Sequence, residues 1–250
     1  MLTSSSPLQQ RIWAYLQERF PPVVYTVLVA LFFGSAVCVG RAWDSSAPVN
    51  PWSALGGVVV LLAFLHLRLM DEFKDYERDC QTHPDRVLSR GIVSLALLKR
   101  MMIGAIALEA VLSIAIGWTA FLWWSAALGF SLLMRIEFGV GKWLSRHIVV
   151  YAITHNPVVA LLAMFAWATT GAKWNWLYMG YVLMVSLGSL AFEIGRKMRL
   201  VEEEVAGVET YSSALGRERA GWLLRAVLAG TLLVGEWTVW VAGNAGVSTW

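Results

Sequence analysis

The sequence predicts an all-α fold, a polytopic transmembrane helix bundle of about seven spans that forms one domain over residues 1–250. Of the 250 residues, 58% are hydrophobic and 15% are charged, whereas an ordinary soluble domain carries about a quarter charged residues. The hydrophobic residues also gather in long runs, and a spanning helix needs about 20 of them. The chain holds 14 Trp, a residue type that is enriched at membrane interfaces.

The chain begins with a polar stretch that becomes amphipathic around Ile12, Trp13 and Leu16. We therefore expect residues 1–19 to form a short helix that lies in the membrane interface. The helix bundle follows over residues 20–242. Its spans are expected at about 22–40, 52–70, 92–117, 119–136, 148–170, 176–195 and 221–242.

The basic residues predict the orientation of these spans through the positive-inside rule. With the N-terminus in the cytosol, only Arg41 and Lys173 of the 20 Lys and Arg residues fall on the outer side. The charged segments 71–91 and 196–220 then form cytosolic loops, and the C-terminal tail lies outside. We expect an integral, multi-pass protein of the cell (inner) membrane.

An acidic stretch, Asp71-Glu-Phe-Lys-Asp-Tyr-Glu-Arg-Asp79, comes directly after the second hydrophobic run. If the helix continues through it, Glu72, Asp75 and Asp79 lie on one face, as do Asp71, Asp75 and Asp79. Like charges at this spacing repel unless cations bind there. Mg²⁺ prefers oxygen ligands and often joins carboxylates to the phosphates of a substrate. The stretch is therefore a candidate Mg²⁺ site, and a solvated loop is the alternative.

Together with the segment Arg86-Val-Leu-Ser-Arg-Gly91, this stretch resembles the first aspartate-rich motif of the UbiA superfamily of intramembrane prenyltransferases. That motif is Asn-Asp-x-x-Asp-x-x-x-Asp, followed by Arg-Pro-Leu-x-x-Gly. Asp75 and Asp79 match outright, and Glu72 and Asp71 stand where the family has Asp and Asn. Val87 replaces the family's proline.

The resemblance covers roughly residues 19–216 and implies a UbiA-like fold, although the family usually has nine spans. It implies that Glu72, Asp75 and Asp79 are the catalytic carboxylates and hold Mg²⁺ with Asp71. It also implies that Arg86 lies near a bound diphosphate. Arg68 could join Arg86 there, or it could pair with the carboxylates three and four residues further along its own helix.

A second acidic motif of the family is expected at the inner end of the sixth span, where the chain has Phe192-Glu-Ile-Gly-Arg-Lys-Met-Arg199. Glu193 stands at an acidic position and is a candidate metal ligand, but Lys197 stands where an Asp is expected. Arg196 and Lys197 could bind the diphosphate directly, or they could simply supply positive charge on the inner side. Lys142 weakly resembles a family lysine near the diphosphate.

The leading functional hypothesis is therefore a Mg²⁺-dependent prenyltransferase whose substrate is a prenyl diphosphate. A UbiA-type terpene cyclase is an alternative, because aromatic side chains could stabilise a carbocation through their ring faces. The same side chains could instead face lipid; they are Trp123, Trp124, Phe130, Trp143, Tyr151 and Phe165. A lipid-diphosphate binder or transporter without enzymatic activity is another alternative. Membrane lipid is the expected surrounding, no nucleic-acid signature is present, and the sequence indicates no particular protein partner.

Overall fold

The computed structural model describes residues 2–44, 51–204 and 209–244, and these residues are helical throughout apart from turns and loops. The predicted all-α fold is thereby confirmed. The helices are α1 (Leu8–Arg19), α2 (Pro22–Trp43), η1 (Pro51–Ser53), α3 (Ala54–Thr82), α4 (Leu95–Ile116), α5 (Trp118–Arg135), η2 (Glu137–Gly139), α6 (Gly141–Leu144), α7 (Ile148–His155), α8 (Pro157–Ala168), α9 (Tyr178–Arg196), η3 (Val201–Glu203), α10 (Tyr211–Leu215) and α11 (Arg217–Asn244).

Helices lie at all seven predicted spans, and five of the described segments are long and apolar enough to cross a membrane. These are Pro22–Trp43, Pro51–Thr82, Ile148–Ala168, Tyr178–Arg196 and Arg217–Gly243. The predicted third and fourth spans, α4 and α5, do not qualify. Three charged residues, Lys99, Arg100 and Glu109, lie within α4. Helix α5 contains several Trp and ends at Arg135, and these residues lower its mean hydropathy.

Short sequence signals explain where the helices begin and break. Pro22 occupies the first turn of α2, where its missing N–H has no helical acceptor to lose. The Ser94 hydroxyl accepts the Leu97 N–H at 3.2 Å and caps α4. Pro157 begins α8 directly after α7, so the fifth span is broken at Asn156, because proline cannot donate the next helical hydrogen bond.

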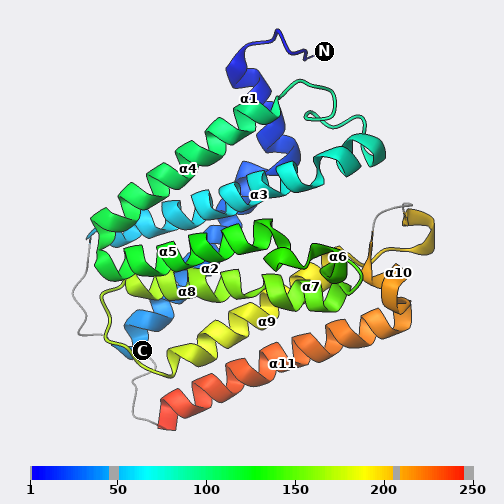
Figure 1. Cartoon of the computed structure of the whole chain (residues 1–250). Coiled ribbons are helices and arrows are strands. Elements are labelled where there is room, and N and C mark those ends of the chain that lie inside the picture. The colour runs from blue at the N-terminus through cyan, green and yellow to red at the C-terminus, as the bar shows by residue number, and fades with distance from the viewer. Residues whose placement is uncertain (1, 45–50, 205–208, 245–250) are drawn as a thin grey trace.

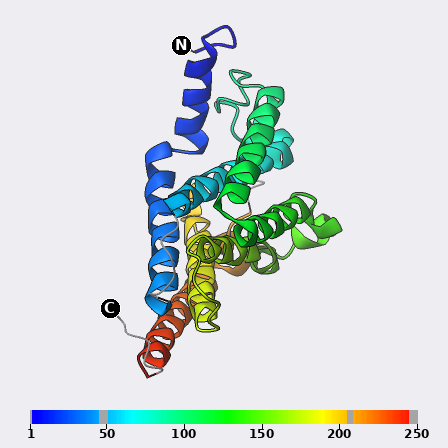
Figure 2. The same cartoon turned by 90° about the vertical axis from the view of Figure 1, so that its left-hand side faces the viewer.

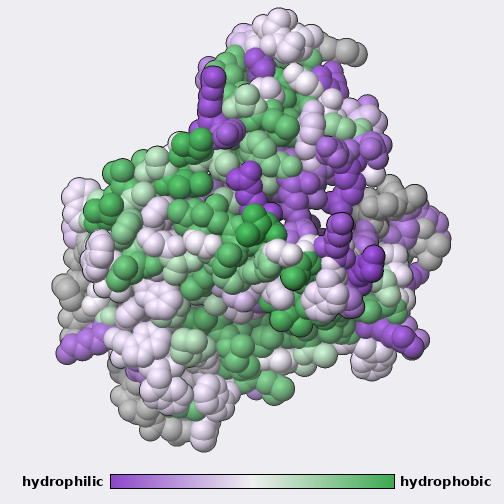
Figure 3. Space-filling model, in the orientation of Figure 1, coloured by the Kyte–Doolittle hydropathy of each residue, from purple (hydrophilic) through white to green (hydrophobic). Residues whose placement is uncertain are grey.

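The long helices run side by side and pack in pairs, α3 along α4, α5 along α8 and α9 along α11 (Figure 1). The view in Figure 2 shows α1 and α2 following one another along one side of the bundle. Hydrophilic side chains gather at the end of the molecule where α6, α7 and α10 lie, and hydrophobic side chains cover the sides of the long helices (Figure 3). We refer to that end as the polar end.

Helix α3 continues well beyond its hydrophobic part, so residues 71–82 of the predicted loop 71–91 are helical instead. A buried cluster at the polar end explains this. Leu69 and Met70 of α3 pack against Tyr15 of α1 and against Leu98 of α4, together with residues of the segment after α3. These contacts hold both flanks of α3 in place and position its acidic residues.

Candidate functional site

The acidic stretch of α3 presents its carboxylates in two groups. Glu72 and Asp79 face α1 and the segment that follows α3, and both bond to arginines there. Asp71 and Asp75 are more accessible, with side chains that are 56% and 33% exposed. The predicted convergence of three carboxylates on one cation is therefore not found, since the described residues contain no group of three or more potential metal ligands.

Glu72 is the most buried of these carboxylates, at 2% exposure. Its Oε1 accepts from Arg19 Nε at 2.7 Å and from Arg68 Nη2 at 2.7 Å. Arg19 belongs to α1, and it also donates from Nη2 to Asp79 at 3.2 Å. The predicted pairing of Arg68 with a carboxylate of its own helix is thus present. The second partner of Glu72, Arg19, was not indicated by the sequence.

In the segment after α3, the residues that match the family motif each have a structural role in the fold. Arg86 pairs with Asp79, Leu88 is buried in the cluster beside α1, and Gly91 adopts a φ of 69°, which favours glycine. At the position of the family's proline, the Val87 N–H donates to the Glu18 carboxylate at 3.1 Å and 3.2 Å.

The second charged segment lies at the end of α9. Glu193 accepts from Arg196 Nε at 2.6 Å, and its other oxygen lies 2.7 Å from Lys197 Nζ. The three residues therefore neutralise one another in part. Tyr211 packs beside them, and its N–H donates to the Lys197 carbonyl at 3.1 Å. Burial first, and then the charge of Glu193, raise the pKa of the Tyr211 phenol to about 12.

Tyr151 of α7 joins the two charged segments. Lys74, from the first segment, donates to the Tyr151 hydroxyl at 2.6 Å, and its Nζ lies 4.8 Å from the centroid of the ring. Lys197, from the second segment, lies 5.7 Å from the same centroid. The Tyr151 ring is therefore approached by cations from both charged segments.

Glu137 completes this arrangement and is held by an unusual backbone. Its carboxylate lies 2.5 Å from Lys74 Nζ. Glu137 and Phe138 have φ values of 50° and 55°, in the left-handed region that costs non-glycine residues about 1–3 kcal/mol each. The Phe138 ring packs against His155 at 5.5 Å, and His155 stacks on Tyr151 at 3.9 Å.

An open hollow of about 430 Å³ lies at the polar end beside these residues. Figure 3 shows hydrophilic side chains around a depression at this end. Cationic groups outnumber carboxylates in its wall, so the hollow suits an anion. It is lined by Lys74, Asp75, Arg78, Arg135, Ile136 and Glu137.

Lys142, a predicted position, lies apart from this cluster, and Asn156 has a structural role. Lys142 is exposed on the short helix α6 and makes no ion pair with a described residue. Asn156 donates from Nδ2 to the Ser186 carbonyl at 2.9 Å and so ties the helix break to α9.

A separate polar cluster lies inside the bundle. Glu109 accepts from Trp124 Nε1 at 2.9 Å and lies 2.8 Å from His66 Nδ1, and all three side chains are buried. The enclosed cavity beside them, which Leu67 and Leu162 also line, holds about 10 Å³, about enough for one water. The interior of the bundle is therefore closely packed around His66 and Glu109.

The donor set fits a smaller metal site than the sequence predicted. Mg²⁺ typically takes one or two carboxylates, with phosphate and water completing its six positions. Asp71 and Asp75 lie one turn apart and are the more accessible pair. Their arginine partners, Arg68 at 3.9 Å and Arg78 at 2.8 Å, form solvent-accessible ion pairs that contribute little. Glu72 and Asp79 fit less well, because one oxygen of each already accepts from two arginines, and Glu193 is engaged by Arg196 and Lys197.

Three important residues were missed or given no role by the sequence reasoning. Lys74 stands at a variable position of the motif, so the motif gave no reason to select it. Glu137 is brought to Lys74 by a backbone conformation that no residue type there indicates. Arg19 is distant in sequence, and only its place at the end of an amphipathic helix could have suggested a role.

Comparison with known proteins identifies one family. Residues 24–250 match the model of the UbiA prenyltransferase family. No curated protein and no solved structure matches the chain.

Proposed function

Because this chain belongs to the UbiA prenyltransferase family and is a multi-pass membrane protein, we propose that it is a Mg²⁺-dependent prenyltransferase acting on a prenyl diphosphate. One observation carries the proposal. Lys74 and Lys197 approach the same Tyr151 ring from the two charged segments, beside the accessible Asp71 and Asp75.

The anionic head of the substrate would bind among these cations at the polar end. Arg78 and Arg135 line the hollow with Lys74, and guanidinium and ammonium groups are good partners for phosphate oxygens. Asp71 and Asp75 would hold Mg²⁺, which neutralises the charge that develops on a leaving diphosphate. Fixed cations around the hollow add to the same stabilisation because they are already oriented.

The Tyr151 ring is suited to the cationic end of the prenyl chain. Two ammonium groups lie within 6 Å of its centroid, the range in which an aromatic face attracts a cation. Its stacking on His155 fixes the orientation of the ring. An allylic cation formed beside the diphosphate would be attracted to the ring once the two ammonium groups are paired with the diphosphate.

The prenyl tail is proposed to leave the hollow sideways, toward lipid. The bundle interior near His66 is too closely packed for it, with a cavity of only about 10 Å³. Ile136 lines the hollow, and Leu132 and Leu133 of α5 are exposed one turn away. These side chains form an apolar surface that continues from the hollow.

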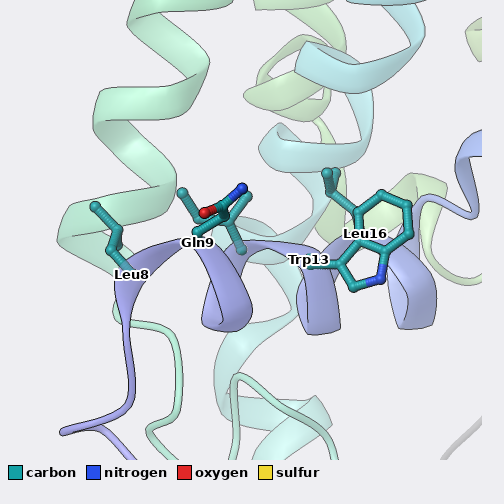
Figure 4. Close-up of a pocket in the computed structure, with 5 residues that line it drawn as sticks. Leu8, Gln9, Trp13 and Leu16 are labelled. Carbon is teal, nitrogen blue, oxygen red and sulfur yellow. The ribbon is translucent and has the colours of Figure 1, made fainter.

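The polar end is proposed to face the cytosol and the chain to reside in the cell (inner) membrane, in accord with the distribution of basic residues. Helix α1 would lie in the interface. Leu8, Gln9, Trp13 and Leu16 line one side of it (Figure 4), and with Ile12 they form an apolar groove of about 510 Å³. Such a face suits the boundary between headgroups and acyl chains.

The proposal is tested by incubating the purified protein with Mg²⁺ and a panel of prenyl diphosphates, with mass spectrometry of the products. A prenylated acceptor supports it. Pyrophosphate released with a cyclised hydrocarbon instead indicates a terpene cyclase, and binding without turnover indicates a lipid-diphosphate binder or transporter.

Asp75→Asn tests the metal assignment. The variant keeps the size of the side chain but removes a charge that Mg²⁺ needs, so Mg²⁺-dependent turnover should fall by about 100-fold or more, about 2.7 kcal/mol or more of the barrier. Glu77→Gln is the matched control, since Glu77 is exposed on the same helix, and it should retain wild-type turnover. Full Mg²⁺-dependent activity in Asp75→Asn contradicts the assignment.

Lys197→Asp tests the role of the cations in the second segment. It restores the acidic residue of the family pattern, yet it removes a cation beside Tyr151 and leaves Glu193 facing another carboxylate. Binding of inorganic pyrophosphate, measured by calorimetry with Mg²⁺, should weaken about tenfold, about 1.4 kcal/mol. Tighter binding would show that Lys197 only supplies charge to the inner side.

A further inference from the structure

Helix α1 is bonded to the first acidic segment at several points. Arg11 Nε donates to the Ile92 carbonyl at 2.5 Å, and the Glu18 carboxylate accepts the Val87 N–H. Tyr15, between them on the helix, is fully buried. A helix held only by the membrane surface would not need these contacts, so α1 is a structural part of the site.

Arg19, the last residue of α1, bridges two of the three carboxylates that match the family motif. Its Nε lies 2.7 Å from Glu72 Oε1 and its Nη2 lies 3.2 Å from Asp79 Oδ2. The exposure of the three side chains is 14%, 2% and 15%. One cation thus joins carboxylates seven residues apart, as a divalent ion does when it bridges two acidic ligands.

Each of these carboxylates also has a second guanidinium. Arg68 donates to Glu72, and Arg86 donates to Asp79. A metal ion at the two bonded oxygens, Glu72 Oε1 and Asp79 Oδ2, would have to displace arginines that are only 14% to 25% exposed. Separating a largely buried charge from its partner is destabilising. The local charge is balanced without a metal.

Tyr15 lies on the same side of the acidic stretch and is fully buried against Leu69 and Met70. The α1 side of the stretch therefore offers arginines and an apolar cluster, a poor surrounding for a divalent cation.

We infer that Arg19 takes the place of a divalent cation between Glu72 and Asp79, so that this chain binds diphosphate with one metal ion, at Asp71 and Asp75, and not with two. The inference rests on the proposed function for the identity of the anion and for the metal site at Asp71 and Asp75. It also gives α1 a defined task, which is to supply a fixed counter-ion to the first acidic segment.

Counting bound Mn²⁺ tests the inference without an activity measurement. Purified protein in nanodiscs is titrated with Mn²⁺ in the presence of inorganic pyrophosphate, and free Mn²⁺ is read by electron paramagnetic resonance. The wild type should bind one Mn²⁺ per chain. Arg19→Gln frees Glu72 and Asp79 and should add a second Mn²⁺, or tighten Mn²⁺ binding at least tenfold.

Arg100→Gln is the matched control, since Arg100 is exposed on α4, outside the site, and this variant should bind Mn²⁺ as the wild type does. Two Mn²⁺ in the wild type would overturn the inference, as would unchanged Mn²⁺ binding in Arg19→Gln. If Arg19→Gln fails to fold, Arg19→Lys decides. A lysine cannot bridge both carboxylates with a planar fork, so Mn²⁺ binding should tighten, and wild-type binding would overturn the inference.

The outcomes for the inference and for the proposed function are separable. If the wild type makes prenylated product but binds two Mn²⁺, the inference fails and the function stands. If no product forms from any prenyl diphosphate while the Mn²⁺ count changes as expected in Arg19→Gln, the function fails and the inference stands.

Discussion

At the scale of single residues, the residues of this chain that differ from the family motif form hydrogen bonds with neighbouring parts of the fold. Val87 replaces a proline, and its N–H, which proline lacks, is bonded by Glu18. Glu72 replaces an aspartate and reaches Arg19 and Arg68 with its longer side chain. The departures therefore accompany the attachment of α1 to the acidic segment.

Val87→Pro moves the sequence toward the family pattern, yet it should destabilise this protein. It removes the N–H that Glu18 accepts, and a hydrogen bond to a charged group contributes about 1.5–3 kcal/mol. Unfolding by sodium dodecyl sulfate in detergent micelles measures the loss. In a Glu18→Ala background the same substitution should cost much less, because the acceptor is already gone. Equal or greater stability of Val87→Pro than of the wild type would show that the bond contributes nothing.

At the scale of elements, α9 and α11 illustrate how this membrane bundle packs. Glycines on α9 and α11 let the two backbones approach closely, as small residues do between membrane helices. A Cβ at Gly180 would lie 2.2 Å from the Thr238 hydroxyl, and one at Gly235 would lie 3.0 Å from Met184. The approach positions α9, and through it Glu193 and Lys197.

Gly180→Ala should therefore destabilise the α9–α11 pair by about 1–3 kcal/mol, the usual cost of overpacking. Thermal unfolding in detergent provides the measurement. Thr238→Ala in the same chain should restore much of the loss because it removes the clashing hydroxyl. Gly195→Ala is the control on the same helix, since a Cβ there meets nothing within 4 Å, and it should not destabilise. A neutral Gly180→Ala would mean that the two helices can shift apart at little cost.

At the scale of the whole molecule, charge is divided between two ends. The acidic and basic residues of the candidate site gather at the polar end (Figure 3), while Lys173 lies at the opposite end, where its N–H bonds to Asp44 at 2.8 Å. This asymmetry is the physical basis of the proposed orientation.

The orientation predicts that the C-terminal tail lies outside the cytosol. A single cysteine is introduced by Gly246→Cys, a position outside the residues that the structure describes, after Cys38 and Cys80 are replaced by Ser. In intact cells an impermeant maleimide should label it from outside. Glu77→Cys, at the polar end, is the control and should react only after the membrane is opened. Labelling at position 246 from the cytosolic side alone would overturn the orientation.

The sequence by itself determined the helical class, the family and the helix positions. Runs of apolar residues near the length of a membrane span can satisfy their backbone only as helices in lipid. Local signals such as Pro22, Ser94 and Asn156-Pro157 act only on neighbouring residues, and in the structure they coincide with helix starts and with the break in the fifth span.

Only the tertiary structure decided which charged residues work together. Spacing placed Glu72, Asp75 and Asp79 on one helical face, but it could not show that Arg19 lies against two of them, because that pairing depends on how α1 docks. The contacts of Lys74 with Tyr151 and Glu137 likewise join α3 to elements more than 60 residues away. Two charged side chains pair only when the fold brings them close in space. Helix periodicity shows which residues share a face of one helix, but not which helix packs against that face.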